Sequence, residues 1–319
     1  MTARTATQMS VVALGGGHGL AASLSALRLL TEHLTAVVTV ADDGGSSGRL
    51  RHEFGVLPPG DLRMALAALC EDGEWGRQWR DVLQHRFVSD GELNKHSLGN
   101  LLIVALWEQL GDPVAGLDWV ARLLGARGRV LPMASVPLDI EARVRGLDPH
   151  DPGAERAVRG QVAVATTPGE ITGIRLLPPD PPPCTEALRA IESCDWVVLG
   201  PGSWFTSVLP HLMVPALGAA LAQAPARRCI TMNLAPADET EGFSAEAQLQ
   251  VFADHAPGMR VDVVLADPSA VEDPAALAKV AGGMGGRLVL RPLALHDGTA
   301  RHDSLRLAAA YRDVFTGRW

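Results

Sequence analysis

The sequence predicts an α/β fold, namely a three-layer, Rossmann-like, doubly wound and mostly parallel sheet with a small antiparallel β insertion. Short apolar runs, such as residues 11–14 and 196–199, end in glycine and are followed by helix-length segments with helical apolar spacing. In residues 129–180, apolar and polar side chains instead alternate with a period of two, in short runs separated by turn residues. A chain of 319 residues that is 47% hydrophobic can bury a large core.

The first half of the chain predicts a β-loop-α-β unit followed by helices. Residues 11–14 form a buried strand, residues 19–30 a helix, and residues 36–40 a second strand that ends in the loop 41–49. Apolar spacing then predicts four helices, which begin near Pro59, Trp75, Ser97 and Pro113.

The second half of the chain returns to the main sheet after the insertion. Within residues 129–180 we expect short strands at 130–132, 137–144, 161–165 and 171–176. The proline-rich run 178–183 is stiff and extended, which suits re-entry into the main domain. Strands at 196–200, 228–232 and 261–265 follow, each before a helix, and a last helix covers 304–314. We therefore expect one domain over 10–319, with 129–180 as an insertion within it.

Composition excludes several classes of function. The net charge of −8 supplies no basic face for nucleic acid. Four cysteines occur singly, which predicts reduced, buried thiols rather than a zinc knuckle or a redox motif. The apolar run near the N-terminus is too short for a signal peptide, and no run is long enough for a membrane span, so we expect a cytoplasmic protein.

The first candidate binding segment is the glycine loop that follows the first strand. Gly15, Gly16, Gly17, His18 and Gly19 would let backbone amides approach a phosphate at the start of a helix. The spacing is neither the dinucleotide fingerprint nor a P-loop. A generic tight turn is the alternative.

The second candidate is an acidic loop that follows the second strand. Asp42 and Asp43 precede a Gly/Ser run that contains Ser46 and Ser47. Carboxylates at the end of a parallel strand can bind ribose hydroxyls, hold Mg²⁺ or act as a base. A solvated turn with an aspartate as helix cap is the alternative.

Two further signals lie in the helical region. Asp61 lies at the start of a predicted helix. Its carboxylate can bind ligand there, and the alternatives are that it caps the helix or pairs with Arg63. His96 lies just before a helix that Ser97 can cap, and the amide of Asn100 lies on the first turn of that helix. An ordinary loop histidine is the alternative for His96.

The remaining candidates lie after later strands. Gly200, Gly202, Ser203 and Thr206 form a second glycine- and hydroxyl-rich turn into a helix, which can cradle phosphate. Asn233 ends the next strand. Arg301 lies before the last helix, and its alternative is a surface ion pair with Asp303.

Most of these segments follow predicted parallel strands. The carboxyl ends of parallel strands share one edge of the sheet, so we expect the segments to converge there. This convergence predicts a site of nucleotide size.

Six segments of the sequence also resemble one family over nearly the whole chain. They are VALGGGHGL, VTVADDGGSSGRLR, LPPGDLRMAL, HSLGNLL, LGPGSWFTSVLP and ETEGFSAEAQL. The series resembles the bacterial gluconeogenesis factor family (YvcK-like), which is related to the 2-phospho-L-lactate transferases (CofD-like). The family usually has threonine where this chain has His18, so the hydroxyl contact expected at that position is missing.

The resemblance implies a UDP-sugar-binding regulator needed for cell shape and cell-wall synthesis on gluconeogenic carbon, without an established reaction. It implies partner proteins that act in cell-wall synthesis or morphogenesis. It is compatible with a homo-oligomer. The alternative branch implies transfer of a phospholactyl group from a nucleoside-diphosphate donor with Mg²⁺, and Asp43 matches the aspartate of that branch. The longer acidic and HSLGNLL segments favour the first branch. We expect Asn100, Gly202 and Ser203 to contact phosphate and Arg301 to bind the diphosphate.

Overall fold

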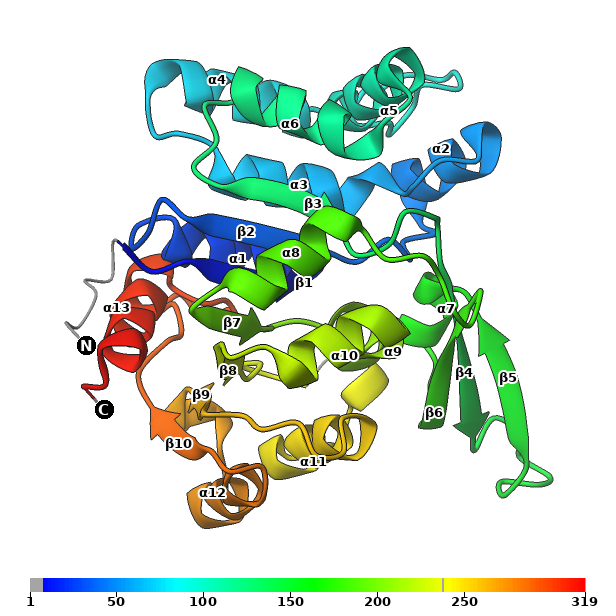
Figure 1. Cartoon of the computed structure of the whole chain (residues 1–319). Coiled ribbons are helices and arrows are strands. Elements are labelled where there is room, and N and C mark those ends of the chain that lie inside the picture. The colour runs from blue at the N-terminus through cyan, green and yellow to red at the C-terminus, as the bar shows by residue number, and fades with distance from the viewer. Residues whose placement is uncertain (1–7, 237, 319) are drawn as a thin grey trace.

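A computed structural model describes residues 8–236 and 238–318 of the chain. A seven-stranded sheet lies at its centre, with the strand order β10-β9-β8-β7-β1-β2-β3 (Figure 1). Every neighbouring pair in this sheet is parallel. Its strands are β1 (Val11–Gly15), β2 (Leu34–Val38), β3 (Arg129–Pro132), β7 (Trp196–Leu199), β8 (Arg227–Thr231), β9 (Val263–Ala266) and β10 (Arg287–Leu290).

Helices cover both faces of the sheet, so the molecule has three layers (Figure 1). Helices α1, α3 and α13 pack together on one face, whereas α8 and α10 pack on the other. The longer helices are α1 (Gly17–Leu27), α2 (Gly45–Phe54), α3 (Pro59–Leu69), α4 (Glu74–Gln84), α5 (Leu98–Leu110), α6 (Pro113–Leu123), α8 (Thr185–Ser193), α10 (Pro215–Gln223), α11 (Ala245–His255), α12 (Pro274–Gly283) and α13 (Ser304–Thr316). The predicted fold class is therefore confirmed.

The order of the strands creates a switch point between β1 and β7. From β1 the chain moves outward to β2 and β3, and from β7 it moves the other way to β8, β9 and β10. Loops that leave two such neighbouring strands diverge to opposite faces and open a crevice between them. The glycine loops that follow β1 and β7 both border this crevice.

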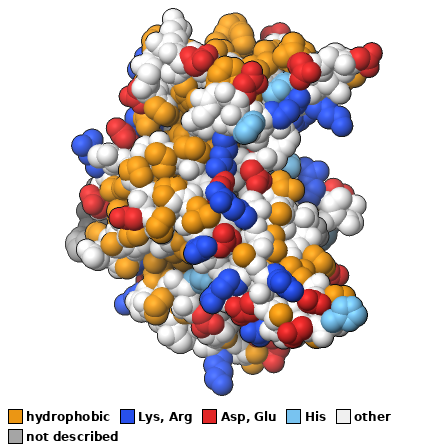
Figure 2. Space-filling view, turned by 90° about the vertical axis from the view of Figure 1, so that its right-hand side faces the viewer, with side chains coloured by type: hydrophobic (Ala, Val, Ile, Leu, Met, Phe, Trp, Pro, Cys, Tyr) orange, Lys and Arg blue, Asp and Glu red, His pale blue; other side chains and the backbone are white. Residues whose placement is uncertain are grey.

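A separate three-stranded antiparallel sheet, β5-β4-β6, forms the small insertion at the right of Figure 1. Its elements are β4 (Asp139–Arg145), β5 (Glu155–Arg159), the short helix α7 (Gln161–Ala165) and β6 (Glu170–Leu177). Arginines and carboxylates pair across its exposed face, as in Arg145–Glu155 at 3.1 Å. Figure 2 shows acidic and basic side chains mixed over the lower part of this side of the molecule.

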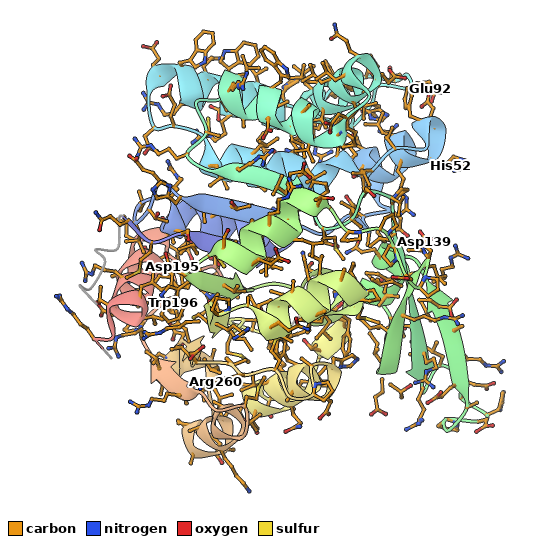
Figure 3. The ribbon with its side chains drawn as sticks, in the orientation of Figure 1. His52, Glu92, Asp139, Asp195, Trp196 and Arg260 are labelled. Atoms are coloured by element: carbon orange, nitrogen blue, oxygen red, sulfur yellow. The ribbon has the colours of Figure 1, made fainter. Side chains whose placement is uncertain are left out.

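Asp139 joins the insertion to the main domain. It accepts hydrogen bonds from Arg51 of α2 at 2.5 Å and from Arg159 of β5 at 2.6 Å. Figure 3 labels Asp139 at the end of the insertion that lies nearest the main sheet. The bond from Arg51 joins β4 to α2, and the bond from Arg159 joins β4 to β5 within the insertion.

Three sequence expectations about local structure are wrong. Residues 129–132, expected within the antiparallel segment, pair parallel with β2. Residues 161–165, expected as a strand, form α7, because Gly160 turns the chain at φ +103° and the Asp43 carboxylate accepts the amide of Val162 at 3.0 Å. Residues 45–49, expected as loop, begin α2.

The start of α2 is helical despite its poor helix formers because its serines have partners. Ser47 Oγ accepts the amide of Gly60 at 3.0 Å, and Ser46 Oγ lies 3.0 Å from His96 Nδ1. Gly48 is required inside the helix, since a Cβ there would overlap the backbone of Asp43. Tertiary contacts therefore override propensity in this segment.

A buried cluster of hydroxyl groups supports the loop that follows β7, residues 200–206, which we call the β7 loop. Tyr311 on α13 places its hydroxyl 2.7 Å from Ser23 Oγ and 2.8 Å from Thr231 Oγ1, and Ser23 donates to the carbonyl of Gly200 at 2.9 Å. The cluster joins α13, α1 and β8 beneath Gly200. All four cysteines are free and buried, as predicted.

Candidate functional site

The two glycine loops touch each other at the switch point. A Cβ on Gly19 would overlap the carbonyl oxygen of Pro201 and lie 2.7 Å from the Cα of Gly202. Only glycine at this third position of α1 allows so close an approach. The start of α1 and the β7 loop therefore form one continuous backbone surface.

A cavity of about 770 Å³ opens on this surface. His18 and Gly19 line it from α1, Gly202 and Ser203 from the β7 loop, and Asn233 from the end of β8. Arg301 closes it from the segment before α13. These are six of the residues that the sequence predicted, drawn from four separate segments.

The β7 loop is held rigidly from below. The side-chain oxygen of Asn233 accepts the amide of Gly202 at 2.8 Å, and its nitrogen donates to the Gly202 carbonyl at 2.9 Å. Ser203 and Thr206 share a short hydrogen bond between their hydroxyls. Asn233 therefore shapes the loop through both ends of its amide.

The buried carboxylate of Glu239 supports the same loop. It accepts the amide of Phe205 at 2.9 Å and hydrogen bonds from the hydroxyls of Ser203 and Thr206. Burial raises its pKa above the ordinary value. The sequence drew attention to the segment around Glu239 but did not predict this role, because nothing local indicates contact with residues 203–206.

Two carboxylates lie beside the first glycine loop. Asp61 of α3 accepts the amide of Gly17, and a Cβ on Gly16 would lie 2.5 Å from Asp61 Oδ2. Burial raises the pKa of Asp61 to about 7, and the neighbouring charge of Asp42 adds to the shift. Burial also raises the pKa of Asp42, which accepts the amide of Gly44 at 2.9 Å.

A third group of predicted residues forms a buried chain of hydrogen bonds behind the acidic loop. The amide of Ser97 and the Asn100 side-chain nitrogen donate to Ser46 Oγ at 3.3 and 3.1 Å. With both lone pairs occupied, the Ser46 hydroxyl donates to His96 Nδ1. The proton of His96 therefore lies on Nε2, and burial lowers the pKa of this histidine.

Arg63 completes the chain of hydrogen bonds. Its Nε donates to Asn100 Oδ1 at 2.9 Å, although the sequence suggested Asp61 as its partner. The side chain is 3% exposed. The sequence gave no signal for the Arg63–Asn100 contact, because these residues lie on different helices.

Asp43 points away from the glycine loops. One of its oxygens accepts the amide of Val162, and the other faces Gly160 closely enough to exclude a Cβ there. Among the described residues, no group of three or more His, Cys, Asp or Glu side chains could hold a metal ion. The surroundings of Asp43 therefore do not fit the Mg²⁺ expected at that residue.

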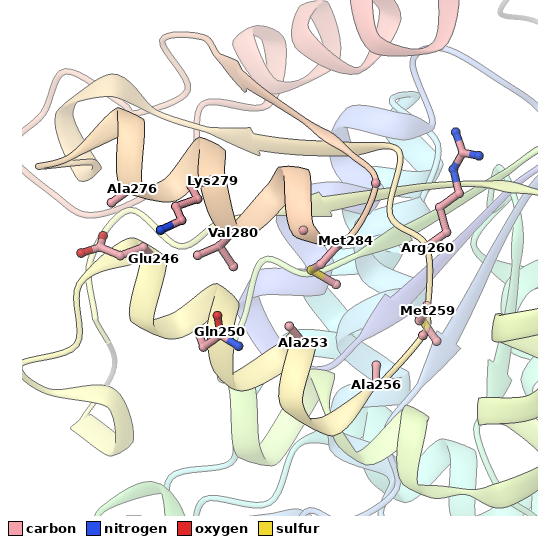
Figure 4. Close-up of a pocket in the computed structure, with 13 residues that line it drawn as sticks. Glu246, Gln250, Ala253, Ala256, Met259, Arg260, Ala276, Lys279, Val280 and Met284 are labelled. Atoms are coloured by element: carbon pink, nitrogen blue, oxygen red, sulfur yellow. The ribbon is translucent and has the colours of Figure 1, made fainter.

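A second groove, of about 710 Å³, lies between α11 and α12 (Figure 4). Alanine, glycine and methionine make up much of its lining, with Glu246 and Lys279 near one end and Arg260 near the other. It contains neither glycine loop. We therefore take the cavity at the switch point as the candidate site.

Comparison with known proteins identifies the family of this chain. A family model described as 2-phospho-L-lactate transferase CofD matches residues 11–294. The chain belongs to the CofD family. The match begins at the first residue of β1 and covers the seven-stranded sheet, the insertion and both glycine loops.

Proteins from several bacteria are similar to this chain over most of its length. A Mycobacterium tuberculosis (strain H37Rv) protein called "Putative gluconeogenesis factor" is 54% identical over 308 residues, which is 95% of this chain and 90% of that protein. The "Gluconeogenesis factor" of Bacillus subtilis (strain 168) is 34% identical over 82% of this chain and 80% of its own.

A solved structure has the same fold. The crystal structure of a UPF0052 family member from Bacillus halodurans superposes with a TM-score of 0.82 at 34% identity, covering 95% of this chain and 98% of that one. No described helix of the present chain has the length and apolar character needed to cross a membrane.

Proposed function

We propose that this protein binds a nucleoside-diphosphate-linked sugar, with UDP-sugars as the ligand class, in the cavity at the switch point. The close contact of the two glycine loops carries the proposal. His18 and Gly19, in the first turn of α1, line the cavity and offer backbone amides to a diphosphate, and the positive end of α1 favours an anion. The cavity, at about 770 Å³, has the size of a typical small-molecule site.

Arg301 supplies a positive side-chain charge, which the two glycine loops lack. Its side chain is exposed and lines the cavity, and Asp303 is engaged elsewhere because it caps α13 by accepting the amides of Leu305 and Arg306. A guanidinium can give two parallel hydrogen bonds to phosphate oxygens. This supports Arg301 as the residue that binds the diphosphate.

The names of the relatives support a role as a gluconeogenesis factor. We extend this to a cytoplasmic regulator of cell shape and cell-wall synthesis, which signals the UDP-sugar supply to a morphogenesis partner. Cells that lack the protein should lose normal shape on gluconeogenic carbon. Arg301→Ala should fail to restore that shape, whereas the parent gene should restore it.

We expect UDP-N-acetylglucosamine to raise the thermal midpoint of the protein. A ligand at one hundred times its Kd contributes about 2.7 kcal/mol to stability, or a rise on the order of 5 °C for a chain of this size. Free N-acetylglucosamine should have no effect, because it lacks the diphosphate. Differential scanning calorimetry measures both, and equal stabilisation by the free sugar would contradict the proposed phosphate contacts.

One observation favours a second function, a Mg²⁺-dependent group transfer from a nucleoside-diphosphate donor. The pKa of Asp61, raised to about 7, suits a base that takes a proton from an acceptor hydroxyl near neutral pH. Because no cluster of described side chains fits a metal ion, Mg²⁺ would have to enter bound to the donor's diphosphate, where it would supply charge neutralisation. Turnover of a nucleotide-linked donor would distinguish this function from binding alone.

Asp61→Asn should stabilise the ligand-free protein at high pH. A carboxyl whose folded pKa is raised keeps its proton longer when folded, so its contribution to stability is lost as the pH rises from about 4 to 7. Removing the ionisable group should therefore raise the free energy of unfolding by about 4 kcal/mol at pH 8 and leave it unchanged below about pH 4. Urea unfolding at both pH values measures the difference.

The exposed Asp81 provides the control for this prediction. Asp81→Asn should leave the pH dependence of stability as in the parent. A gain for Asp61→Asn that is equal at pH 8 and pH 4 would show that Asp61 does not titrate near neutrality.

A further inference from the structure

A third pocket, of about 810 Å³, lies beside the start of α2. Arg49, Arg86 and Lys95 line it, and Glu92 is the one carboxylate among its lining residues. The charged side chains therefore sum to +2. Gly45 and Ser46, the first residues of α2, also line the pocket, so the positive end of that helix adds to the field.

Backbone carbonyls hold the two arginines of the pocket. Arg49 donates to the carbonyls of Glu92 and Asn94 at 3.0 and 2.7 Å, and Arg86 donates to the carbonyl of Lys95 at 3.0 Å. Within the described part of the chain, no ion pair involves Arg49, Arg86 or Lys95. Figure 3 labels Glu92 near His52 of α2, at the same end of the molecule. The guanidinium groups are thus fixed in place while their charges stay unneutralised.

A buried cation lies behind the wall of this pocket. Arg63 connects to Ser46 through Asn100, and its Nη1 is buried with no hydrogen-bond partner among the described residues. Burial and repulsion by Arg86 lower the pKa of Arg63 to about 10. An anion in the pocket would offset the repulsion between Arg86 and Arg63.

We propose that this pocket binds the phosphate group of a small molecule, at a site separate from the one at the switch point. Two arginine side chains held by backbone carbonyls, with a lysine beside them, are suited to a tetrahedral oxyanion because their remaining donors are free to bind it. Exposed single charges are worth little, but several converging cations with a helix end form a specific anion site. The proposal is independent of whether a UDP-sugar binds in the first cavity.

The chain contains only two lysines, Lys95 and Lys279, which gives a direct test. Reductive methylation with ¹³C-formaldehyde keeps their charge and yields a resolved NMR signal for each, assigned with Lys95→Arg and Lys279→Arg. Inorganic phosphate, titrated against chloride at matched ionic strength, should shift the Lys95 signal with saturation. The Lys279 signal, from the groove between α11 and α12, should stay in place.

Two variants sharpen the result. Arg86→Gln should weaken phosphate binding by tenfold or more, whereas Arg80→Gln on α4, where Arg80 pairs with Asp81, should leave it unchanged. Glycerol 3-phosphate in place of phosphate separates the two sources of the ligand. Tighter binding of the ester indicates a phosphorylated metabolite, and equal binding indicates inorganic phosphate itself.

Two kinds of result would overturn the phosphate-site proposal. If the Lys95 signal does not move, or if both lysine signals drift in proportion to the added salt, the phosphate site does not exist. Unaltered phosphate affinity in folded Arg86→Gln would also overturn it. Since the UDP-sugar titration uses a different cavity and different residues, either proposal can fail while the other stands.

Discussion

Gly19→Ala is expected to reduce UDP-sugar affinity by more than a hundredfold. The new Cβ would overlap the Pro201 carbonyl oxygen and crowd Gly202, and both are backbone atoms that cannot rotate away. The β7 loop must therefore move off α1, which disrupts the joint surface that is proposed to bind the diphosphate. Overpacking of this kind also costs about 1–3 kcal/mol of stability. Isothermal titration and urea unfolding measure the two effects.

Gly282→Ala on α12 is the matched control for this change. Gly282 also lies in a helix, but a Cβ there would meet nothing within 4 Å. Alanine is the better helix former by about 1 kcal/mol, so this variant should be as stable as the parent or slightly more stable. Its ligand affinity should not change. If Gly19→Ala keeps the parental affinity, the contact between the loops does not form the binding site.

Arg301→Ala has the second largest expected effect, a loss of affinity from tenfold to over a hundredfold. Removing a guanidinium that binds a diphosphate costs about 1.5–3 kcal/mol of binding free energy. The stability of the ligand-free protein should hardly change, because the side chain is exposed and Asp303 already has its own role as a helix cap. Titrating UDP-glucose into both proteins at matched salt measures the difference.

Two related variants complete the Arg301 experiment. Arg301→Lys keeps the charge but loses the parallel donors, so its affinity should fall between those of Arg301→Ala and the parent. Arg312→Ala on α13, where the arginine pairs with the adjacent Asp313, should bind like the parent. An unchanged Kd for Arg301→Ala removes that residue from the site.

Strong periodic signals in the sequence predicted most of the fold. Buried strands such as β1 and β7 consist of continuous apolar runs that end at glycine, and the sheet order then brings their loops together as expected. By contrast, β5 was not predicted, because its residues Glu155–Arg159 are mostly charged and exposed. Such a strand is specified by its partner β4 rather than by its own pattern.

The candidate site was predictable where it depends on strand ends and not where it depends on packing between helices. His18, Gly202, Asn233 and Arg301 line one cavity, as the convergence argument requires. Ser46, His96 and Asn100 were predicted beside the nucleotide, but they form a buried chain of hydrogen bonds with Arg63. Their partners come from α2, α3 and α5, and no spacing along the sequence encodes how these helices pack.

Asp43 illustrates the same limit at a single residue. Two adjacent aspartates after a strand look equivalent in the sequence, yet their side chains leave the backbone on opposite sides. Asp42 lies beside Ser47 and Gly60, close to Asp61, whereas Asp43 caps α7 of the insertion. The choice depends on the position of residues 160–162, which lie more than a hundred positions away along the chain.

Photoaffinity labelling tests the location of the nucleotide site most directly. 5-Azido-UDP-glucose, activated by light and followed by peptide mapping, should label peptides that contain residues 200–206 or 294–303, and excess UDP-glucose should suppress that labelling. These segments line the cavity at the switch point. Competable labelling confined to residues 246–285, which line the groove between α11 and α12, would contradict the account.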